Sequence, residues 1–97
     1  MPKGYWIAHV TITDPQKYPS YIAANAEAFA KYEARFLVRG GDAEVVEGNA
    51  GGRHVVLEFP SYQQALDCYH SPEYAEALKL RKTCANADVI IVEGHDG

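Results

Sequence analysis

The chain has 97 residues, of which 47% are hydrophobic, with 9 basic and 13 acidic side chains. A chain of this length has room for one hydrophobic core, so we expect a single domain over residues 1–97. The net charge of −4 argues against the clustered positive surface that nucleic acids require. No apolar run approaches the roughly 20 residues of a membrane span, so neither a nucleic acid nor a membrane is expected as partner.

The start of the chain and its two cysteines bear on the cellular compartment. Residues 1–4 lead into a strand-like segment without the apolar region of a signal peptide. Cys68 and Cys84 lack Cys-x-x-Cys spacing, so a disulfide scaffold or a zinc ribbon is not indicated. We therefore expect a cytoplasmic protein with reduced thiols.

The first third of the chain predicts a strand followed by a long helix. Residues 5–12 are rich in aromatic and β-branched side chains, which is typical of a strand. Asp14 is then expected to cap a helix with Pro15 at its first position. Apolar residues recur at spacings of three and four, which indicates one amphipathic helix to about Ala34.

The middle of the chain predicts a β-hairpin. Residues 36–39 restart the strand pattern, Gly40 and Gly41 interrupt it, and residues 44–47 are a candidate resumption. The glycine-rich segment 48–52 supplies a flexible connection to a further strand at 54–59.

The last third predicts a divided helix and a final strand. Ser61 with Gln64 three residues later matches a capping box. Ser71, Pro72 and Glu73 form a second helix start, so the helical region is expected to break near His70 and to continue towards Cys84. Residues 89–92 are the final strand.

The resulting β-α-β-β-α-β order predicts an α+β, ferredoxin-like fold, with a four-stranded antiparallel sheet and helices on one face. The other face is too apolar for a solvated surface. Its expected apolar residues are Ile7, Leu37, Val56 and either Ile90 or Ile91. We therefore predict a homodimer in which two open sheet faces pack together.

Two residues are candidates for chemistry in a cleft between the sheet and the helices. His9 lies in mid-strand among apolar residues and has the side chain of a proton-transfer group, although a core or interface histidine is the simpler interpretation. Arg39 precedes Gly40 and Gly41, which would let a ligand approach the backbone. Its guanidinium is a candidate contact for a substrate carboxylate, with an ion pair as the alternative.

Further polar residues are candidates for the wall of a ligand pocket. Tyr21, Asn25, Tyr69 and Tyr74 place polar tips on helices that should cover the sheet, although most tyrosines of this kind are core or boundary residues. Ser71 joins these candidates but is better explained as a helix cap than as a nucleophile.

The remaining charged residues are candidates for ion pairs and for metal binding. For Arg35 and Arg81 an ion pair with a carboxylate such as Glu58 or Glu93 is favoured, and Arg81 is also a candidate ligand contact. His54 and Glu58 stand about 13 Å apart along one strand, and no helical His-x-x-x-His spacing occurs. We expect neither a metal site nor an organic cofactor.

Several motifs in this order resemble the bacterial family known as domain of unknown function 1330 (DUF1330), over essentially the whole chain. The resemblance rests on GYWIAHV at 4–10, TDP at 13–15, RFLVRGG at 35–41, VLEFPS at 56–61, YHSPEY at 69–74 and VEG at 92–94, with Tyr18, Tyr21 and Arg81 between them. It implies the dimeric α+β barrel superfamily. Relatives in that superfamily include cofactor-independent monooxygenases, haem-binding proteins and isomerases.

The chain departs from the family pattern at two places. Glu33 and Ala34 stand where Gly-Gly is expected, so the resemblance implies that the first helix runs further here. Cys68 replaces a larger aromatic residue, which would enlarge the cavity.

Three hypotheses of function remain open at this stage. The first is a homodimeric enzyme for a small aromatic or carboxylate-bearing molecule, without metal. The second is a non-catalytic ligand-binding or stress-associated dimer. The third is a haem-binding protein with His70 as axial ligand.

Overall fold

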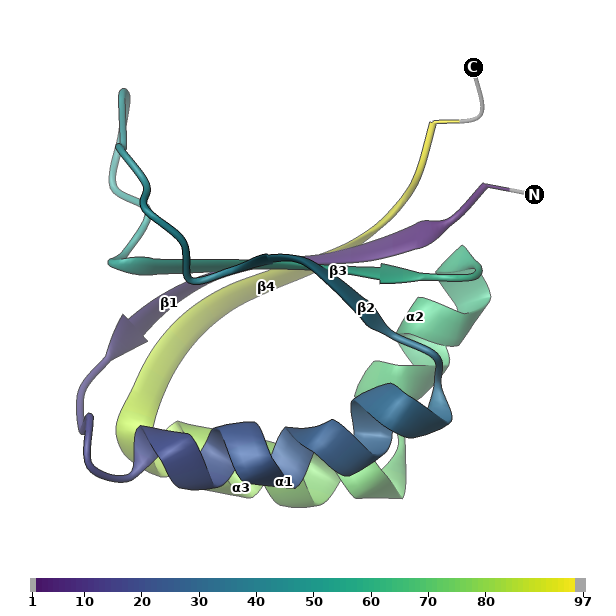
Figure 1. Ribbon diagram of the computed structural model, residues 1–97, viewed down its shortest axis with the longest axis horizontal. Helices are drawn as coiled ribbons and strands as arrows, with labels where there is room; N and C mark the ends of the chain where they lie inside the picture. Colours follow the sequence, from purple (N-terminus) through teal and green to yellow (C-terminus); the bar gives the residue numbers. More distant parts are fainter. Residues whose placement is uncertain (1, 96–97) are drawn as a thin grey trace.

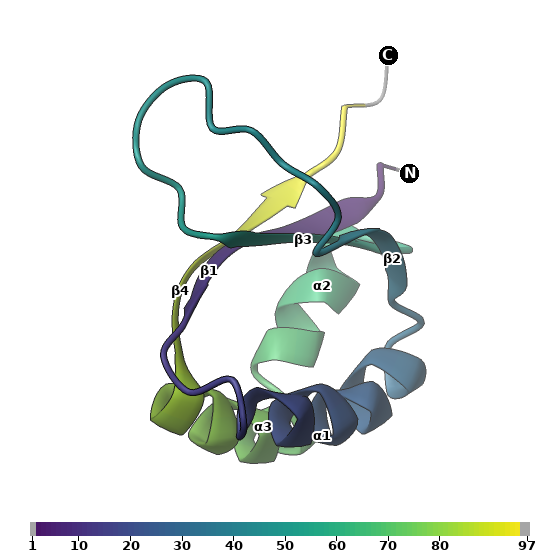
Figure 2. The ribbon, with the colours of Figure 1, turned by 60° about the vertical axis from the view of Figure 1, so that its left-hand side comes forward.

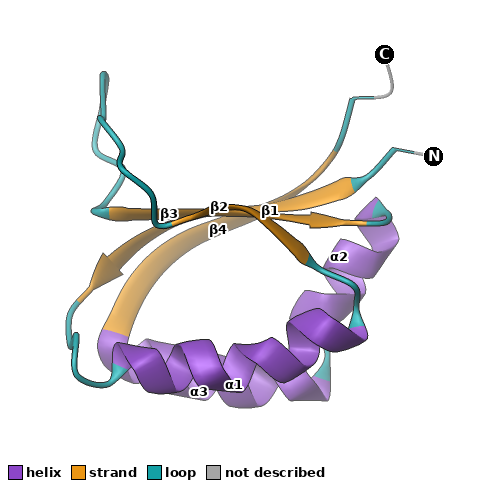
Figure 3. Ribbon diagram, in the orientation of Figure 1, coloured by secondary structure: helices purple, strands orange, loops and turns teal. Residues whose placement is uncertain are grey.

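The computed structural model describes residues 2–95 as one antiparallel sheet with three helices on one of its faces (Figures 1 and 3). The elements in chain order are β1 (Gly4–Ile12), α1 (Tyr18–Lys31), β2 (Arg35–Arg39), β3 (Arg53–Phe59), α2 (Tyr62–Tyr69), α3 (Pro72–Cys84) and β4 (Ala85–Glu93). The strands lie in the order β2-β3-β1-β4. This is the predicted ferredoxin-like α+β fold. Within the described residues, no helix has the length and apolar character needed to cross a membrane.

Helix α1 is shorter at both ends than predicted. It begins at Tyr18, because a helix starting at Pro15 would place Pro19 in its interior, where proline breaks the hydrogen-bond ladder. Asp14 instead stabilises the preceding turn, since its Oδ1 accepts a hydrogen bond from the Gln16 backbone N–H at 3.1 Å. At the other end α1 stops at Lys31, and Glu33 takes a φ of 60°. Glu33 thus adopts the left-handed conformation that favours glycine, and the expected extension of the helix is wrong.

The β2-β3 hairpin is confirmed, but its connection contains no resumed strand at 44–47. Residues 40–52 form a loop that stands on the opposite side of the sheet from α1 and α3 (Figures 1 and 2). The register shifts between Phe36 and Val38. Because of this bulge, Arg35 pairs with Glu58 whereas Arg39 pairs with Val55. The two arginines therefore lie on opposite faces of the sheet, not on one side as expected from simple alternation.

The predicted division of the second helical region is confirmed. The hydroxyl oxygen of Ser61 caps α2 by accepting from the Gln64 backbone N–H, and that of Ser71 caps α3 by accepting from the Tyr74 backbone N–H, both at 3.1 Å. The Gln64 side chain does not complete the capping box, because it donates to the Tyr32 carbonyl at 2.8 Å. Strand β4 follows α3 directly and is longer than predicted.

The core between sheet and helices is built around the Trp6 ring. Four aromatic rings have centroids 5.0–5.6 Å from it, those of Phe29, Phe59, Tyr69 and Tyr74. The Trp6 indole N–H donates to the Ala65 carbonyl at 2.8 Å, so the ring is fixed between β1 and α2. Cys68 and Cys84 are buried free thiols.

The open face of the sheet carries an aliphatic row across all four strands. The register places Val38, Val56, Ile7 and Ile90 side by side. Val38 therefore takes the place predicted for Leu37, because of the bulge before it, and Ile90 is the member of the Ile90/Ile91 alternative that lies in the row. Ile90 is 57% exposed and Val38 is 42% exposed. Charged and polar rows flank the aliphatic row on both sides, with Arg35, Glu58 and Tyr5 on one side and His54, His9 and Asp88 on the other.

Candidate functional site

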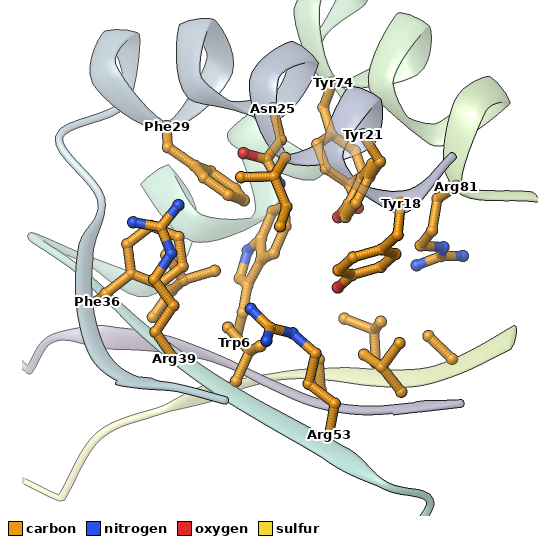
Figure 4. A pocket seen from close by; sticks show the side chains of 17 residues that line it. Trp6, Tyr18, Tyr21, Asn25, Phe29, Phe36, Arg39, Arg53, Tyr74 and Arg81 are labelled. Carbon is orange, nitrogen blue, oxygen red and sulfur yellow. The ribbon is translucent and has the colours of Figure 1, made fainter. Parts of the chain in front are cut away.

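A partly enclosed pocket lies between the sheet and helices α1 and α3 (Figure 4). Its cavity volume is about 40 Å³. Aromatic and aliphatic side chains make up most of its wall. The polar and aromatic residues that line it are Trp6, Tyr18, Tyr21, Asn25, Phe29, Phe36, Arg39, Arg53, Tyr74 and Arg81.

The helix side of the pocket carries a buried pair of tyrosine hydroxyls. The Oη atoms of Tyr21 and Tyr74 lie 2.8 Å apart, one donating to the other. Burial raises the pKa of Tyr74 far above its ordinary value. Burial also raises the pKa of Tyr21, although hydrogen bonds with Tyr74 and Asn25 and the charge of Arg81 oppose this shift. Both hydroxyls therefore stay protonated at neutral pH and serve as hydrogen-bond donors, not as bases.

The sheet side of the pocket carries two guanidinium groups. Arg39 is the last residue of β2, and its Cζ lies 4.1 Å from the centroid of the Phe36 ring. Arg53 is the first residue of β3, and its Cζ lies 5.4 Å from the centroid of the Tyr18 ring. These aromatic faces hold both cations without neutralising them.

Arg81 brings a third guanidinium from α3. Its side chain is buried, with the residue 9% exposed, and its Nε has no hydrogen-bond partner. The Nε of Arg53 is likewise buried and unpartnered. Neither Arg35 nor Arg81 takes part in a salt bridge within residues 2–95, so the expected ion pair of either arginine with Glu58 or Glu93 does not form. Glu58 instead accepts from the Tyr5 hydroxyl and pairs with Lys3.

Gly40 has a different role from the one expected. Instead of opening the backbone to a ligand, it makes room for an arginine, because a Cβ at this position would overlap the Arg53 guanidinium. Its φ of 72° is also in the left-handed region. Gly41, by contrast, has open space around it.

We therefore expect Gly40→Ala to displace Arg53 and to lower the free energy of unfolding by about 1–2 kcal/mol, through strain at positive φ. Gly41→Ala is the matched control and should change stability by less than about 0.5 kcal/mol. Urea unfolding of both variants measures the difference. Equal stabilities would contradict the strain expected for a side chain at the positive φ of Gly40.

The structure brings together most, but not all, of the predicted site residues. Those that line the pocket are Arg39, Tyr21, Asn25, Tyr74 and Arg81. Tyr69 packs against the Trp6 and Tyr74 rings in the core. Ser71 is a helix cap whose hydroxyl also donates to the Cys68 carbonyl at 2.7 Å. Neither Tyr69 nor Ser71 is among the residues that line the pocket.

His9 lies on the open face of the sheet, away from the pocket. Its Nδ1 is 2.9 Å from the Nδ1 of His54 on the neighbouring strand, and it pairs with Asp88 on the other side. Because strand side chains alternate, the same pattern that turns Trp6, Ala8 and Val10 towards the helices turns His9 the other way. His9 therefore does not face the cleft in which it was expected to transfer protons. No group of three or more His, Cys, Asp or Glu side chains suited to a metal ion occurs in the described part of the chain.

Arg53 is the functional candidate that the sequence interpretation missed. The signal was present, because Arg53 precedes Val55, Leu57 and Phe59 at intervals of two. With Val56 predicted on the open face, alternation turns these three residues to the inner face, but the predicted strand begins at His54, one residue after the observed start. Extending the alternation by one step places Arg53 on the pocket side.

The fold and the pocket place this chain in the class of ferredoxin-like proteins with a cleft between sheet and helices. The family model described as "Domain of unknown function (DUF1330)" matches residues 3–95, so the chain belongs to the DUF1330 family. Among curated proteins, none matches the sequence.

Three solved structures illustrate what the fold is similar to. A protein of unknown function from Rhodopseudomonas palustris has a TM-score of 0.76 and 15% identity, covering 99% of this chain and 85% of its own. SnoaB, a cofactor-independent oxygenase from Streptomyces nogalater, has a TM-score of 0.64 and 10% identity, covering 100% and 97%. A dimeric ferredoxin-like protein of unknown function from Thermobifida fusca has a TM-score of 0.64 and 17% identity, covering 95% and 91%. At these identities the likeness shows the fold.

Proposed function

We propose that this protein is a homodimer that binds a small, planar, anionic molecule in the pocket between its sheet and helices. The observation that carries the proposal is the pocket wall itself. It combines the faces of aromatic rings with the guanidinium groups of Arg39, Arg53 and Arg81. The described residues that line it include no aspartate and no glutamate, so the positive charge of the pocket is left for a ligand to neutralise.

Packing of the open sheet face supports the dimer. Contact with water is unfavourable for the aliphatic row of Val38, Val56, Ile7 and Ile90. Packing of this row and the polar rows beside it against a second copy would give an interface with a hydrophobic centre and a polar rim. The loop at 40–52 stands on the same side of the sheet and adds the 82% exposed Val46. The fold neighbour from Thermobifida fusca is described as dimeric, which agrees with this arrangement.

The placement of the histidines favours binding over histidine-dependent catalysis. His9 and His54 face the opposite side of the sheet from the pocket. His70 ends α2, where its ring contacts Tyr69, and it is not among the pocket residues. Both a general base at His9 and a haem ligand at His70 therefore lack access to a molecule in the pocket. The non-catalytic alternative is the one that the pocket supports.

Binding can be followed through Trp6, which is the one tryptophan of the chain and lines the pocket. We expect benzoate to change the Trp6 emission in a saturable manner and neutral benzamide to bind at least about 10-fold more weakly, because only the carboxylate pairs with a guanidinium. Arg39→Gln should weaken benzoate binding by a similar factor. The measurement is a fluorescence titration at low salt, where such pairs are strongest.

Arg35→Gln is the matched control for Arg39→Gln. It removes the same charge from the same strand, but on the open face, so its benzoate affinity should equal that of the unmodified chain. Light scattering on each variant checks that the assembly is unchanged. Equal binding of benzoate and benzamide, or the same loss in both variants, would count against an anion site at Arg39.

A further inference from the structure

We infer that the ligand of this pocket carries two anionic groups, one for the sheet-side arginines and one for Arg81, on a flat unsaturated or aromatic body. The chemical class is a planar dicarboxylate or an equivalent dianion. This inference rests on the proposed function and makes it more specific, because a pocket for any small anion would need only one of these positions.

The first argument is the charge of the wall. Arginine stays protonated at all relevant pH values, so Arg39, Arg53 and Arg81 bring three positive charges to one pocket. None of them takes part in a salt bridge within residues 2–95. One carboxylate accepts a two-pronged contact from a single guanidinium. Arg81 is buried, whereas Arg53 is half-buried and Arg39 is exposed. A monoanion held at Arg39 would therefore leave the buried Arg81 without an anionic partner, which is costly.

The second argument is the separate position of the cations. Arg39 ends β2, at one edge of the sheet, whereas Arg81 lies one turn before β4, which forms the other edge. Figure 4 shows Arg39 and Arg81 on opposite sides of the cavity, with Arg53 on the sheet side between them. Neighbouring strands are about 4.8 Å apart, so the edges of this four-stranded sheet are about 14 Å apart, and the two arginines enter the pocket from opposite sides.

The third argument is what surrounds Arg81. Its Nε is buried and unpartnered, and its charge lowers the pKa of both Tyr21 and Tyr74 against the larger effect of burial. Arg81, Tyr21 and Tyr74 all line the pocket from its helix side (Figure 4). One of these hydroxyls is used within the pair, and the other proton is free to be donated. This combination of a cation and a neutral donor fits an oxygen anion.

The fourth argument concerns the body of the ligand. Between the sheet-side arginines and Arg81 the wall is formed by Trp6, Phe29 and aliphatic side chains of the sheet. Such surfaces favour a flat apolar group through ring stacking and burial. A flexible aliphatic diacid would lose more rotational freedom on binding than a rigid ring bearing the same two groups.

The experiment compares rigid probes by Trp6 fluorescence, using the full-length protein. The probes are benzoate with one carboxylate, isophthalate and terephthalate with two, and benzamide with none. We expect one of the two dicarboxylates to bind at least about 10-fold more tightly than benzoate. Arg39→Gln and Arg81→Gln should each reduce this advantage to less than about 2-fold, and raised salt should reduce it as well.

Lys82→Gln is the matched control for Arg81→Gln, because it removes a positive charge from the adjacent, exposed position of α3. It should leave the dicarboxylate advantage unchanged. Should Arg81→Gln fail to fold, as judged by circular dichroism, Arg81→Lys keeps the charge but loses the two-pronged contact, and we expect it to retain less than half of the advantage.

The outcomes separate this inference from the proposed function. If benzoate and both dicarboxylates bind with equal affinity, the two-anion inference is overturned while the anion pocket stands. If the dicarboxylate advantage survives in both Arg39→Gln and Arg81→Gln, the two positions are wrongly assigned. If no anionic probe changes the Trp6 emission, the proposed function itself fails.

Discussion

Replacing Ile90 by glutamate should convert the proposed dimer of about 21 kDa, twice the 10.7 kDa of the chain, into a monomer at micromolar concentration. Ile90 is 57% exposed in the single chain, so a carboxylate there costs the fold little. In a face-to-face dimer the same side chain is buried in the aliphatic row beside Ile7, where an unpaired charge is strongly unfavourable. Two-fold symmetry doubles the penalty, and we expect dissociation to be favoured by at least about 100-fold.

The matched control is Leu80→Glu. Leu80 is 40% exposed, but it lies on α3 and so belongs to the layer on the other face of the sheet. This variant should remain dimeric at the same concentration. Light scattering coupled to size-exclusion chromatography measures both masses. A monomeric unmodified protein, or loss of the dimer in Leu80→Glu alone, would show that the aliphatic row is not the interface.

Side-chain alternation along β1 was enough to predict both faces of the sheet, and the apolar character of its open face. It was also enough to exclude His9 from the pocket, because His9 lies on the same strand face as Ile7. The prediction of His9 as a proton-transfer residue rested on the chemistry of its imidazole and disregarded the strand face on which His9 lies. In the structure, the alternation of side chains along β1 decides which face His9 occupies.

Local irregularities could not be predicted from periodicity. The bulge between Phe36 and Val38 moves Arg39 to the pocket side, and nothing in the sequence of β2 indicates where a strand takes up an extra residue. Glutamate does not favour the φ of 60° that Glu33 adopts, so the only indication of it was the Gly-Gly that the family resemblance leads one to expect at 33–34. The early end of α1 is set by the chain that follows, because residue 35 must already pair with β3.

Raising the pH above 9 should destabilise the protein through three buried groups that must stay neutral when folded. Burial raises the pKa of Cys68 from 9.0 to about 12, and burial also raises the pKa of Tyr21 and of Tyr74 above 10.0. In the unfolded chain these groups release their protons near their ordinary pKa values. The unfolded state then binds fewer protons than the folded state, so the free energy of unfolding falls with pH.

The pH window follows from these shifts. Stability is fully present below about pH 8, falls by up to about 1.4 kcal/mol per pH unit above pH 9 through Cys68, and falls more steeply above pH 10 when both tyrosines contribute. By pH 11 the loss through Cys68 alone is about 3 kcal/mol, and the two tyrosines add to it, so the loss is a large part of the total stability of a small domain. Urea unfolding between pH 7 and pH 11, at one protein concentration, measures this curve.

Single substitutions assign the curve to its groups. Cys68→Ala should flatten the decline between pH 9 and pH 10, because it removes the group that titrates first in the unfolded chain. Tyr74→Phe should reduce the slope above pH 10 by about 1.4 kcal/mol per pH unit. Tyr62→Phe, at an exposed position, should leave both slopes unchanged. The slope is the informative quantity, because each substitution also alters packing or a hydrogen bond by an amount that does not depend on pH.

The contradicting result is an unfolding free energy that stays level from pH 8 to pH 11. It would mean that Cys68, Tyr21 and Tyr74 lose their protons at the same pH in the folded protein as in the unfolded chain. The Tyr21–Tyr74 side of the pocket would then be open to water.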